Sequence, residues 1–315
     1  MIQHWQKEGL IYAGRAQIPT VFEKDKDTWR IFFADRTKDN KSFIRYIDVE
    51  AGNPKNIKYE FKDSLLDFGS FGAFDHEGIM PSWVVKESGN VYLYYIGWSV
   101  RKDVPYQNSI GLAMSRDNGD TFEKVTKGPM LGTDPQEPYF CSTPCVISRL
   151  NADHLYYLSC VGWWQTDPAA PLEARYLIKH RERGVTSHWG KFSDTIIDFK
   201  NNEEGGICRP SIIVENNNWH MWYCYRDLWD YRNNKQHSYK IGYAMPNFDI
   251  RDRWIRKDED CLLELSSQGW DSEMLCYPYV IKFKDLYYMF YNGNGFGTSG
   301  FGYATLESRV INNLR

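Results

Sequence analysis

The stretch Ile18-Pro19-Thr20-Val21-Phe22 is the first of five copies of one pattern, in which a proline leads a short apolar strand. The other copies are Met80-Pro81-Ser82-Trp83-Val84-Val85, Thr143-Pro144-Cys145-Val146-Ile147, Arg209-Pro210-Ser211-Ile212-Ile213-Val214 and Tyr277-Pro278-Tyr279-Val280-Ile281. Successive prolines are 62, 63, 66 and 68 residues apart. A repeat of nearly constant period indicates copies of a single supersecondary unit.

Each copy continues with further segments that have strand character. Aromatic-rich runs follow at 29–33, 91–96, 155–158, 219–223 and 286–291, and turn residues rich in Asn, Asp and Gly separate most of them from the first strand. Such runs read as hairpin partners. Third strands are expected at 42–47, 109–114, 176–179, 240–245 and 301–305, with an Ile-Gly-Leu/Tyr-Ala or Phe-Gly-Tyr-Ala motif in three of them. Fourth strands follow polar turns, as at 117–122 and 252–254.

Four antiparallel strands that repeat around an axis form a β-propeller. Five copies therefore predict an all-β, five-bladed β-propeller with four antiparallel strands per blade, which takes up residues 1–315 as a single domain. Only ten residues follow Thr305, so we expect the N-terminal stretch 9–13 to supply the missing fourth strand and close the ring. Closure would remove the exposed sheet edges. A generic β-sandwich is the alternative, and the matched copies disfavour it.

The composition limits the partners of the chain. A formal net charge of −3 provides no large positive field, so we expect no nucleic-acid partner. No apolar run approaches the roughly 20 residues that span a membrane, and the first eight residues lack the apolar stretch of a signal peptide. Seven cysteines without framework spacing fit a reducing compartment. We therefore expect a cytoplasmic protein without a membrane span.

In a propeller, the leading ends of the inner strands and the trailing ends of the second strands meet at one mouth of the central channel. This geometry selects four candidate catalytic acids, Asp75, Glu77, Glu204 and Glu273. It selects as substrate-binding candidates Asp35, Arg36, His76, Trp98, Trp163, Arg209, Arg226, Asp227, Trp270, Asp271, Tyr277, Asn292 and Asn294. Carboxylates, guanidinium groups and amides form paired hydrogen bonds to hydroxyls, and Trp offers a flat apolar face. The sequence therefore predicts a carbohydrate ligand.

The chain resembles the five-bladed propeller superfamily of arabinanases, xylosidases, invertases and levansucrases. Phe74-Asp75-His76-Glu77-Gly78 and Tyr291-Asn292-Gly293-Asn294-Gly295 are also similar to segments of uncharacterised propellers from surface-polysaccharide gene clusters. The resemblance implies hydrolysis of a glycosidic bond by two carboxylates, one a proton donor and the other a nucleophile or base. The chain departs from the pattern before the first proline, where Gln17 and Ile18 stand in place of an Asp. Arg209 replaces an acid before the fourth proline.

The leading interpretation is therefore a glycoside hydrolase in which Glu77 and Glu273 are the working carboxylates. Asp75 and Glu204 are reserve candidates for the base or for stabilising the transition state. A glycosyltransferase of surface-polysaccharide biosynthesis is an alternative, since Arg36, Arg209 and Arg226 are suited to hold a donor phosphate. A non-catalytic carbohydrate-binding propeller is the third interpretation.

Other signals carry less weight. The glycine-rich stretch 293–300 lies between two expected strands and opens no helix, so it lacks the mechanics of a phosphate-binding loop. Cys141, Cys145, Cys208 and Cys276 show no zinc-ligand spacing, although Cys208 with His76 is a conceivable nucleophile pair. We expect no cofactor, and leave open a divalent ion on the axis.

Overall fold

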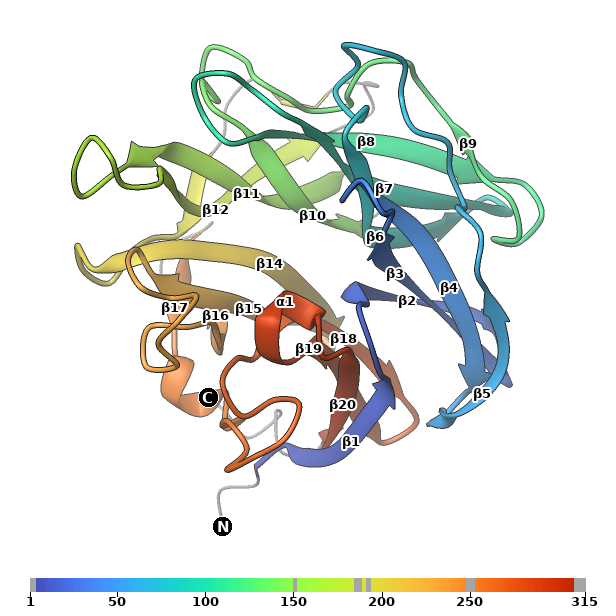
Figure 1. The fold of residues 1–315 in the computed structure, drawn as a ribbon. Helices are drawn as coiled ribbons and strands as arrows, with labels where there is room; N and C mark the ends of the chain where they lie inside the picture. Colours follow the sequence, from blue (N-terminus) through green and yellow to red (C-terminus); the bar gives the residue numbers. More distant parts are fainter. Residues whose placement is uncertain (1–3, 150–151, 184–188, 191–193, 248–252, 309–315) are drawn as a thin grey trace.

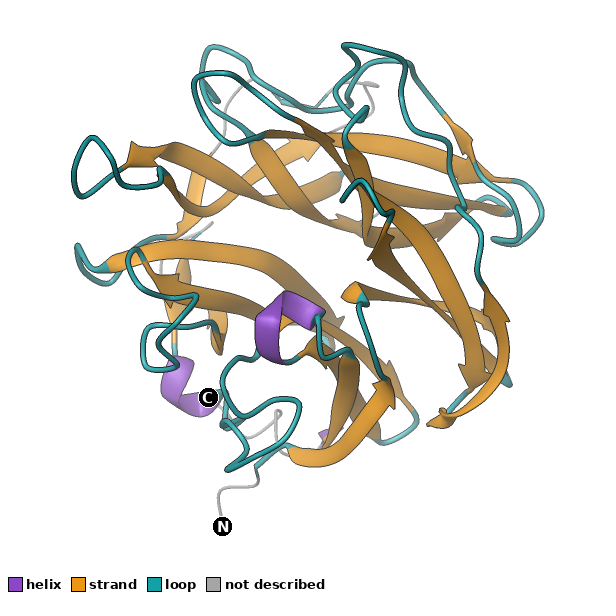
Figure 2. Ribbon diagram, viewed as in Figure 1, coloured by secondary structure: helices purple, strands orange, loops and turns teal. Residues whose placement is uncertain are grey.

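The protein is built almost entirely of β-strands arranged around a common centre (Figures 1 and 2). The computed structural model describes residues 4–149, 152–183, 189–190, 194–247 and 253–308. The strands of the first half are β1 (Gln6–Tyr12), β2 (Gln17–Asp25), β3 (Thr28–Arg36), β4 (Ser42–Glu50), β5 (Asn53–Phe61), β6 (Gly78–Glu87), β7 (Asn90–Ser99), β8 (Gln107–Ser115), β9 (Glu123–Lys124) and β10 (Cys141–Ser148).

The second half of the chain continues in the same way and adds two short helical segments. It contains β11 (Asp153–Trp164), β12 (Glu173–Arg183), β13 (Asp194–Ile197), β14 (Glu204–Glu215), β15 (Asn218–Asp227), β16 (Lys240–Pro246), β17 (Trp254–Arg256), η1 (Asp258–Asp260), β18 (Cys276–Phe283), β19 (Leu286–Asn292), α1 (Asn294–Gly297) and β20 (Phe301–Glu307). The all-β class predicted from the strand patterns is confirmed.

The strand pairings divide the chain into repeated antiparallel groups. β2 to β5, β6 to β9, β10 to β13 and β14 to β17 each pair in sequence order, and the remaining sheet has the order β1-β20-β19-β18. Single parallel bridges connect β4 with β6 and β12 with β14. The proline-led strands contact one another in the cyclic order β2, β6, β10, β14, β18 and back to β2. The leading ends of these five strands therefore lie close together.

The residue before the proline has an unusual backbone in four of the five inner strands. Ile18, Thr143, Arg209 and Tyr277 have φ values of 58°, 42°, 58° and 57°. A residue before proline normally prefers an extended conformation, and a positive φ is uncommon for any residue other than glycine. The register of each strand shifts at this point, as at a β-bulge. The bulges bend the strands where they enter the centre of the molecule.

The motif glycine of the third strand lies opposite an aromatic residue of the second strand. Tyr95 pairs with Gly111, Tyr223 with Gly242 and Tyr291 with Gly302. A Cβ on Gly111 would lie 2.2 Å from Cζ of Tyr95, so the tyrosine ring occupies the space of the missing side chain. The Tyr223 ring likewise lies against Gly242, whereas a Cβ on Gly302 would meet the Gly9 carbonyl and the Trp270 ring.

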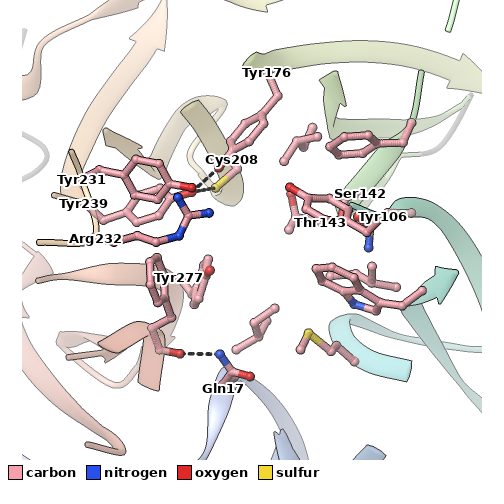
Figure 3. A pocket seen from close by; sticks show the side chains of 18 of the residues that line it. Gln17, Tyr106, Ser142, Thr143, Tyr176, Cys208, Tyr231, Arg232, Tyr239 and Tyr277 are labelled. Atoms are coloured by element: carbon pink, nitrogen blue, oxygen red, sulfur yellow. Dashed lines mark hydrogen bonds between the residues drawn. The ribbon is translucent and has the colours of Figure 1, made fainter. Parts of the chain in front are cut away.

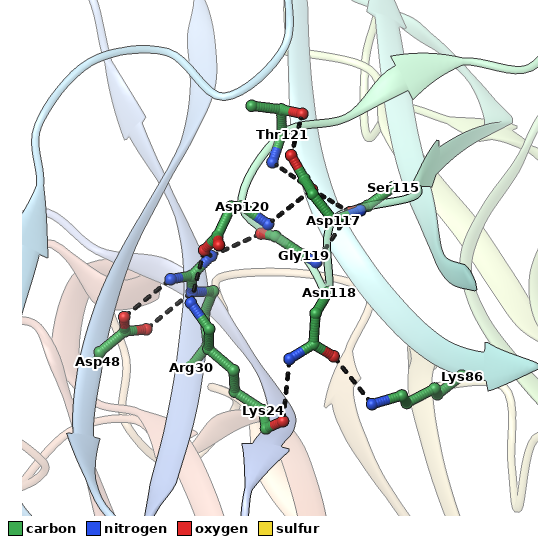
Figure 4. Close-up of polar contacts among 10 residues, drawn as sticks. All are labelled: Lys24, Arg30, Asp48, Lys86, Ser115, Asp117, Asn118, Gly119, Asp120 and Thr121. Atoms are coloured by element: carbon green, nitrogen blue, oxygen red, sulfur yellow. Dashed lines mark hydrogen bonds and ion pairs between the residues drawn. The ribbon is translucent and has the colours of Figure 1, made fainter. Parts of the chain in front are cut away.

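A polar junction joins the second group of strands to the first (Figure 4). Arg30 of β3 binds Asp48 of β4 through two hydrogen bonds of 2.7 and 2.8 Å. The same guanidinium donates to the Gly119 carbonyl at 2.6 Å and contacts Asp120 at 2.9 Å, in the loop between β8 and β9. Lys24 of β2 also pairs with Asp120, at 2.5 Å. Bidentate, charge-assisted contacts of this kind fix the orientation of neighbouring sheets.

The glycine and tyrosine pairing predicts the effect of one methyl group. Gly111→Ala should lower the free energy of unfolding by about 1–3 kcal/mol, because the new Cβ overlaps the Tyr95 ring. Gly128→Ala is the control, since nothing lies within 4 Å of its Cβ position, and it should change stability by less than about 0.5 kcal/mol. Urea unfolding followed by fluorescence measures both. Equal stabilities of the two variants would contradict this account of the motif.

Candidate functional site

The leading ends of the inner strands enclose a central pocket of about 280 Å³ (Figure 3). We use the name central pocket for the space lined by Gln17, Ile18, Arg36, Met80, Ile96, Trp98, Tyr106, Asn108, Phe140, Ser142, Thr143, Leu158, Tyr176, Cys208, Tyr231, Arg232, Tyr239, Tyr277 and Phe296. Ile18, Met80, Thr143 and Tyr277 are residues that precede the repeated prolines. The bulged backbone at three of these positions therefore forms part of the pocket lining.

One wall of the central pocket consists of packed aromatic rings. The Trp98 ring lies 4.9 Å from that of Tyr106, which in turn lies 5.4 Å from Phe140 and 5.0 Å from Trp163. Trp163 does not line the central pocket but lines a side pocket that shares Tyr106 and Phe140 with it. Rings held by their neighbours offer apolar area to a ligand with little loss of side-chain entropy.

The opposite wall is formed by tyrosines that a buried arginine supports. Figure 3 shows Tyr231, Tyr239 and Tyr277 across the pocket from Tyr106. The Arg226 guanidinium lies 3.7 Å from the centre of the Tyr231 ring, and its Nε donates to the Tyr176 hydroxyl at 3.2 Å. Burial raises the pKa values of Tyr176 and Tyr239 well above their ordinary value. These hydroxyls therefore stay protonated and uncharged at neutral pH.

The charged groups on the lining itself are both arginines. Arg232 pairs with Glu173 outside the lining. Among the described residues, the Arg36 guanidinium bonds only to neutral groups, Gln17 Oε1 at 3.3 Å and the carbonyl and side-chain oxygens of Asn40 at 3.0 and 3.1 Å. Burial and the neighbouring Arg15 charge lower the pKa of Arg36. Within the described part of the chain, no Asp or Glu lines the central pocket.

Two buried donors on the lining have no hydrogen-bond partner among the described residues. They are the indole Nε1 of Trp98 and the amide Nδ2 of Asn108, whose residue is only 2% exposed. A buried donor without an acceptor costs about 1–3 kcal/mol, and such groups are rare in native proteins. Both residues belong to the lining of the central pocket.

Asp75 and Asp271 lie in buried clusters away from the pocket lining. The Asp75 carboxylate accepts a hydrogen bond of 2.9 Å from Tyr95 and pairs with Lys124 of β9 at 2.6 Å. Asp271 repeats this arrangement with Tyr291 at 2.9 Å and Lys7 of β1 at 2.6 Å. We call these groups acid-tyrosine-lysine clamps. Each carboxylate is neutralised by its own lysine within its own sheet.

Glu204 is likewise buried and paired. Its two oxygens accept hydrogen bonds of 2.7 Å from Arg256 of β17, which also binds Asp258 at 2.8 Å. Tyr223 donates to Asp258, so Tyr223 is connected to Glu204 through Asp258 and Arg256. From the positions of these acids at the strand ends, we expected them to meet at the mouth of the channel. The structure instead turns Asp75, Glu204 and Asp271 sideways along their sheets, toward cations on the outer strands.

Glu77 and Glu273 line two different side pockets. Glu77, about one-third exposed, lies 3.3 Å from Lys41 and 3.4 Å from His76. Glu273 is exposed and lines a pocket of about 550 Å³ that shares Tyr231 and Arg232 with the central pocket. The Glu77 pocket shares no lining residue with the central pocket, and it adjoins the Trp163 side pocket through Arg101, Asp103 and Gln107. The described geometry does not bring the two carboxylates into one pocket.

The other residues selected from the sequence fall into three sets. Arg36, Trp98 and Tyr277 line the central pocket, whereas Arg209 and Arg226 lie buried behind its lining. The remaining residues make contacts elsewhere: Asp35 with Arg45, His76 with the Gly69 carbonyl, Asp227 with His237, Trp270 with Tyr291, Asn292 with the backbone of Ala16, Ile18 and Gly300, and Asn294 with the backbone of Gly269, Glu273 and Met274.

Several residues that line the central pocket were not among the site residues predicted from the sequence. Tyr106 directly precedes β8 and Asn108 lies at its start, Tyr176 lies in β12, and Tyr231 and Arg232 lie in the long connection between β15 and β16. The start of a third strand lies beside the end of its antiparallel second strand, so this geometry could have identified Tyr106 and Asn108. The connection 228–239 lies outside the repeat, and no pattern in the sequence marked it.

The described residues hold no group of three or more His, Cys, Asp or Glu side chains placed to bind a metal ion. The seven cysteines are buried and free. Cys208 lies 3.4 Å from Cys224, sulfur to sulfur. No helix in the described ranges has both the length and the apolar character needed to cross a bilayer.

Comparison with known proteins points to one fold. No protein-family model matches the chain. Two proteins of Mycobacterium tuberculosis, the uncharacterized proteins MT1551 and Rv1502, are each 29% identical over 313 residues, which cover 96% of this chain and 99% of each relative. Among solved structures, a glycoside hydrolase has a TM-score of 0.71 at 15% identity and covers 98% of this chain and 92% of its own.

Two further solved structures agree. A thermostable family-43 glycoside hydrolase has a TM-score of 0.68 at 15% identity, with 96% of this chain and 91% of that chain covered. A structure from the GH130 family of mannoside phosphorylases has a TM-score of 0.68 at 12% identity, with 98% of this chain and 95% of that chain covered. That family contains glycoside hydrolases that target beta-1,2 mannosidic linkages in Candida mannan. The chain therefore has the fold of propeller-type glycoside hydrolases.

The clamps predict a structural effect for Asp75. Asp75→Asn should lower the free energy of unfolding by about 2 kcal/mol or more, because it leaves the Lys124 charge without its buried partner. Glu77→Gln, two residues away, should cost less than about 1 kcal/mol, since its contacts are partly exposed. Denaturant unfolding of both variants measures the difference. An Asp75→Asn protein as stable as Glu77→Gln would show that the clamp does not support the fold.

Proposed function

We propose that this chain is a five-bladed β-propeller, closed by its N-terminal strand, and that it acts as a carbohydrate-active hydrolase with its sugar site in the central pocket. The observation that carries the proposal is the aromatic wall of Trp98, Tyr106 and Phe140 at the point where the inner strands converge. The cyclic contacts of the inner strands and the pairing of β1 with β20 support the ring. The fold shared with glycoside hydrolases supports the reaction class.

Glu273 is the leading candidate for the proton donor. Its pocket adjoins the central pocket directly, through Tyr231 and Arg232. Asn294 accepts hydrogen bonds from the backbone of Glu273 and Met274 at 2.8 and 3.2 Å, which holds the loop in place while the carboxylate faces the pocket. Glu77 is the other candidate from the sequence, but its pocket shares no lining residue with the central pocket or with the Glu273 pocket. Asp75 and Glu204 take lower priority because their charges are already neutralised in buried pairs.

A non-catalytic carbohydrate-binding propeller is the second candidate. One observation favours it: the described lining of the central pocket contains no carboxylate. A hydrolase of the paired-carboxylate kind needs both groups within roughly 5–10 Å of each other around the bond. A protein of this kind would bind a sugar against the aromatic wall without hydrolysing it.

Turnover separates the two candidates. With a responsive glycoside, Glu273→Gln should reduce turnover at least about 100-fold, because a positioned proton donor contributes roughly 10²–10⁴-fold. Glu77→Gln should also reduce turnover if it supplies the second carboxylate. Glu123→Gln, exposed on β9, is the matched control and should retain full activity. Full retention in both test variants would exclude this pair of carboxylates. Absence of turnover by the wild-type protein on every glycoside tested would leave the binding role.

Sugar binding tests the location of the site. Trp98→Ala should weaken the binding of an oligosaccharide roughly tenfold, because it removes both the stacking face and the unpartnered indole donor. Tyr59→Ala, an exposed aromatic on β5, serves as the control and should bind normally. Isothermal titration calorimetry measures both. Unchanged affinity in Trp98→Ala would move the sugar site away from the central pocket.

A further inference from the structure

Four arginines lie on or directly behind the lining of the central pocket, and one of them, Arg232, is paired with an acid, Glu173. Within the described part of the chain, Arg36, Arg209 and Arg226 form no ion pair. Arg209 bonds to the backbone or hydroxyl oxygens of Pro19, Thr20 and Ser82. Arg226 bonds to the Tyr176 hydroxyl and to two backbone carbonyls.

These arginines lie close to the pocket through the residues that they contact. Arg36 is itself on the lining, Arg209 follows the lining residue Cys208, and Arg226 packs against the lining tyrosines Tyr176 and Tyr231. Arg209 and Arg226 are 0% and 2% exposed. Bulk water screens buried charges poorly, so their field reaches into the pocket.

The unpartnered polar groups of the central pocket are all hydrogen-bond donors and therefore require an acceptor. The indole Nε1 of Trp98 can only donate a hydrogen bond, and the unpartnered atom of Asn108 is its amide nitrogen, also a donor. The Arg36 guanidinium carries five N–H donors and accepts none. The hydroxyls of a neutral sugar donate as well as accept, and their donors normally bind to carboxylates. The described lining offers them no carboxylate.

We infer that the central pocket selects a sugar that carries an anionic group, a carboxylate or a phosphate, and that Arg36, Asn108 and Trp98 bind the oxygens of that group. This inference rests on the proposed function, because it assumes that the ligand is a carbohydrate. An anion would accept from all of the unpartnered donors and would offset the charge of Arg36. The aromatic wall of Trp98 and Tyr106 would then contact the sugar ring that bears it.

Calorimetry with four probes tests the inference: D-glucose, D-glucuronic acid, glucose 6-phosphate and inorganic phosphate. At least one charged sugar should bind the wild-type protein roughly tenfold or more tightly than glucose, as expected for charge-assisted hydrogen bonds. The comparison of glucuronic acid with glucose 6-phosphate identifies which anion is preferred. Inorganic phosphate should bind more weakly than the preferred charged sugar, because it lacks the ring that the aromatic wall contacts.

Variants assign the preference to the arginine. Arg36→Gln should reduce the preference for the charged sugar over glucose roughly tenfold, and Arg36→Lys should retain part of it. Arg116→Gln removes an exposed arginine on the periphery, paired with Glu123, and should behave as wild type. Thermal unfolding checks that each variant is folded. The charged-sugar preference should also weaken as salt is added.

Three results would overturn the inference: glucose binding as tightly as both charged sugars, an undiminished preference in Arg36→Gln, or no binding of either charged sugar. Failure of the inference and failure of the proposed function remain distinguishable. A neutral oligosaccharide that binds in a Trp98-dependent manner would overturn the anionic preference while supporting the sugar site. A charged sugar that binds through Arg36, with no turnover of any glycoside by the wild-type protein, would support the preference and contradict the hydrolase.

Discussion

The buried guanidinium of Arg209 is the contact on which the centre of the molecule depends. It extends from the bulge of β14 and bonds to the Pro19 carbonyl of β2 and the Ser82 carbonyl of β6, so one side chain joins the leading ends of three inner strands. Burial lowers the pKa of Arg209 to about 10, so the group remains charged at neutral pH. A charge solvated only by carbonyls and hydroxyls constrains those groups to point inward, and the strands must meet around it.

The pairing of charges within the sheets also determines which charged groups lie near the central pocket. Each clamp uses an acid from the leader of an inner strand to hold a tyrosine and a cation of the same sheet. Glu137, which binds Tyr157 at 2.7 Å and Lys179 at 3.1 Å, repeats this arrangement in another sheet. The acids of the clamps do not line the central pocket, whereas Arg209 and Arg226 behind the lining form no ion pair with any described residue. The positive pocket is therefore a consequence of how the sheets are stabilised.

The sequence predicted the all-β class and the strand runs because both follow from periodicity, which is a local property. It predicted Trp98, Arg36 and Tyr277 as site residues because the ends of regular strands converge by geometry. It could not predict the direction of a side chain at a strand leader. Asp75 and Glu77 are separated by one residue, yet the first is buried against Tyr95 and the second lines a side pocket. That difference depends on contacts with Lys124 and Lys41, which are distant in sequence.

The connection between β15 and β16 contributes pocket residues that do not belong to the repeated strands. Tyr231 and Arg232 come from a segment with no counterpart in the repeat, and they form the boundary between the central pocket and the pocket of Glu273. Asp75 and Asp271 lie in the loops that lead into β6 and β18, and both are committed to the clamps. Glu273 lies in the same loop as Asp271, beside Asn294, but its side chain is exposed. Two acids of one loop therefore differ in what they can do: the first supports the sheet, and the second is open to a ligand, as the proposed function requires.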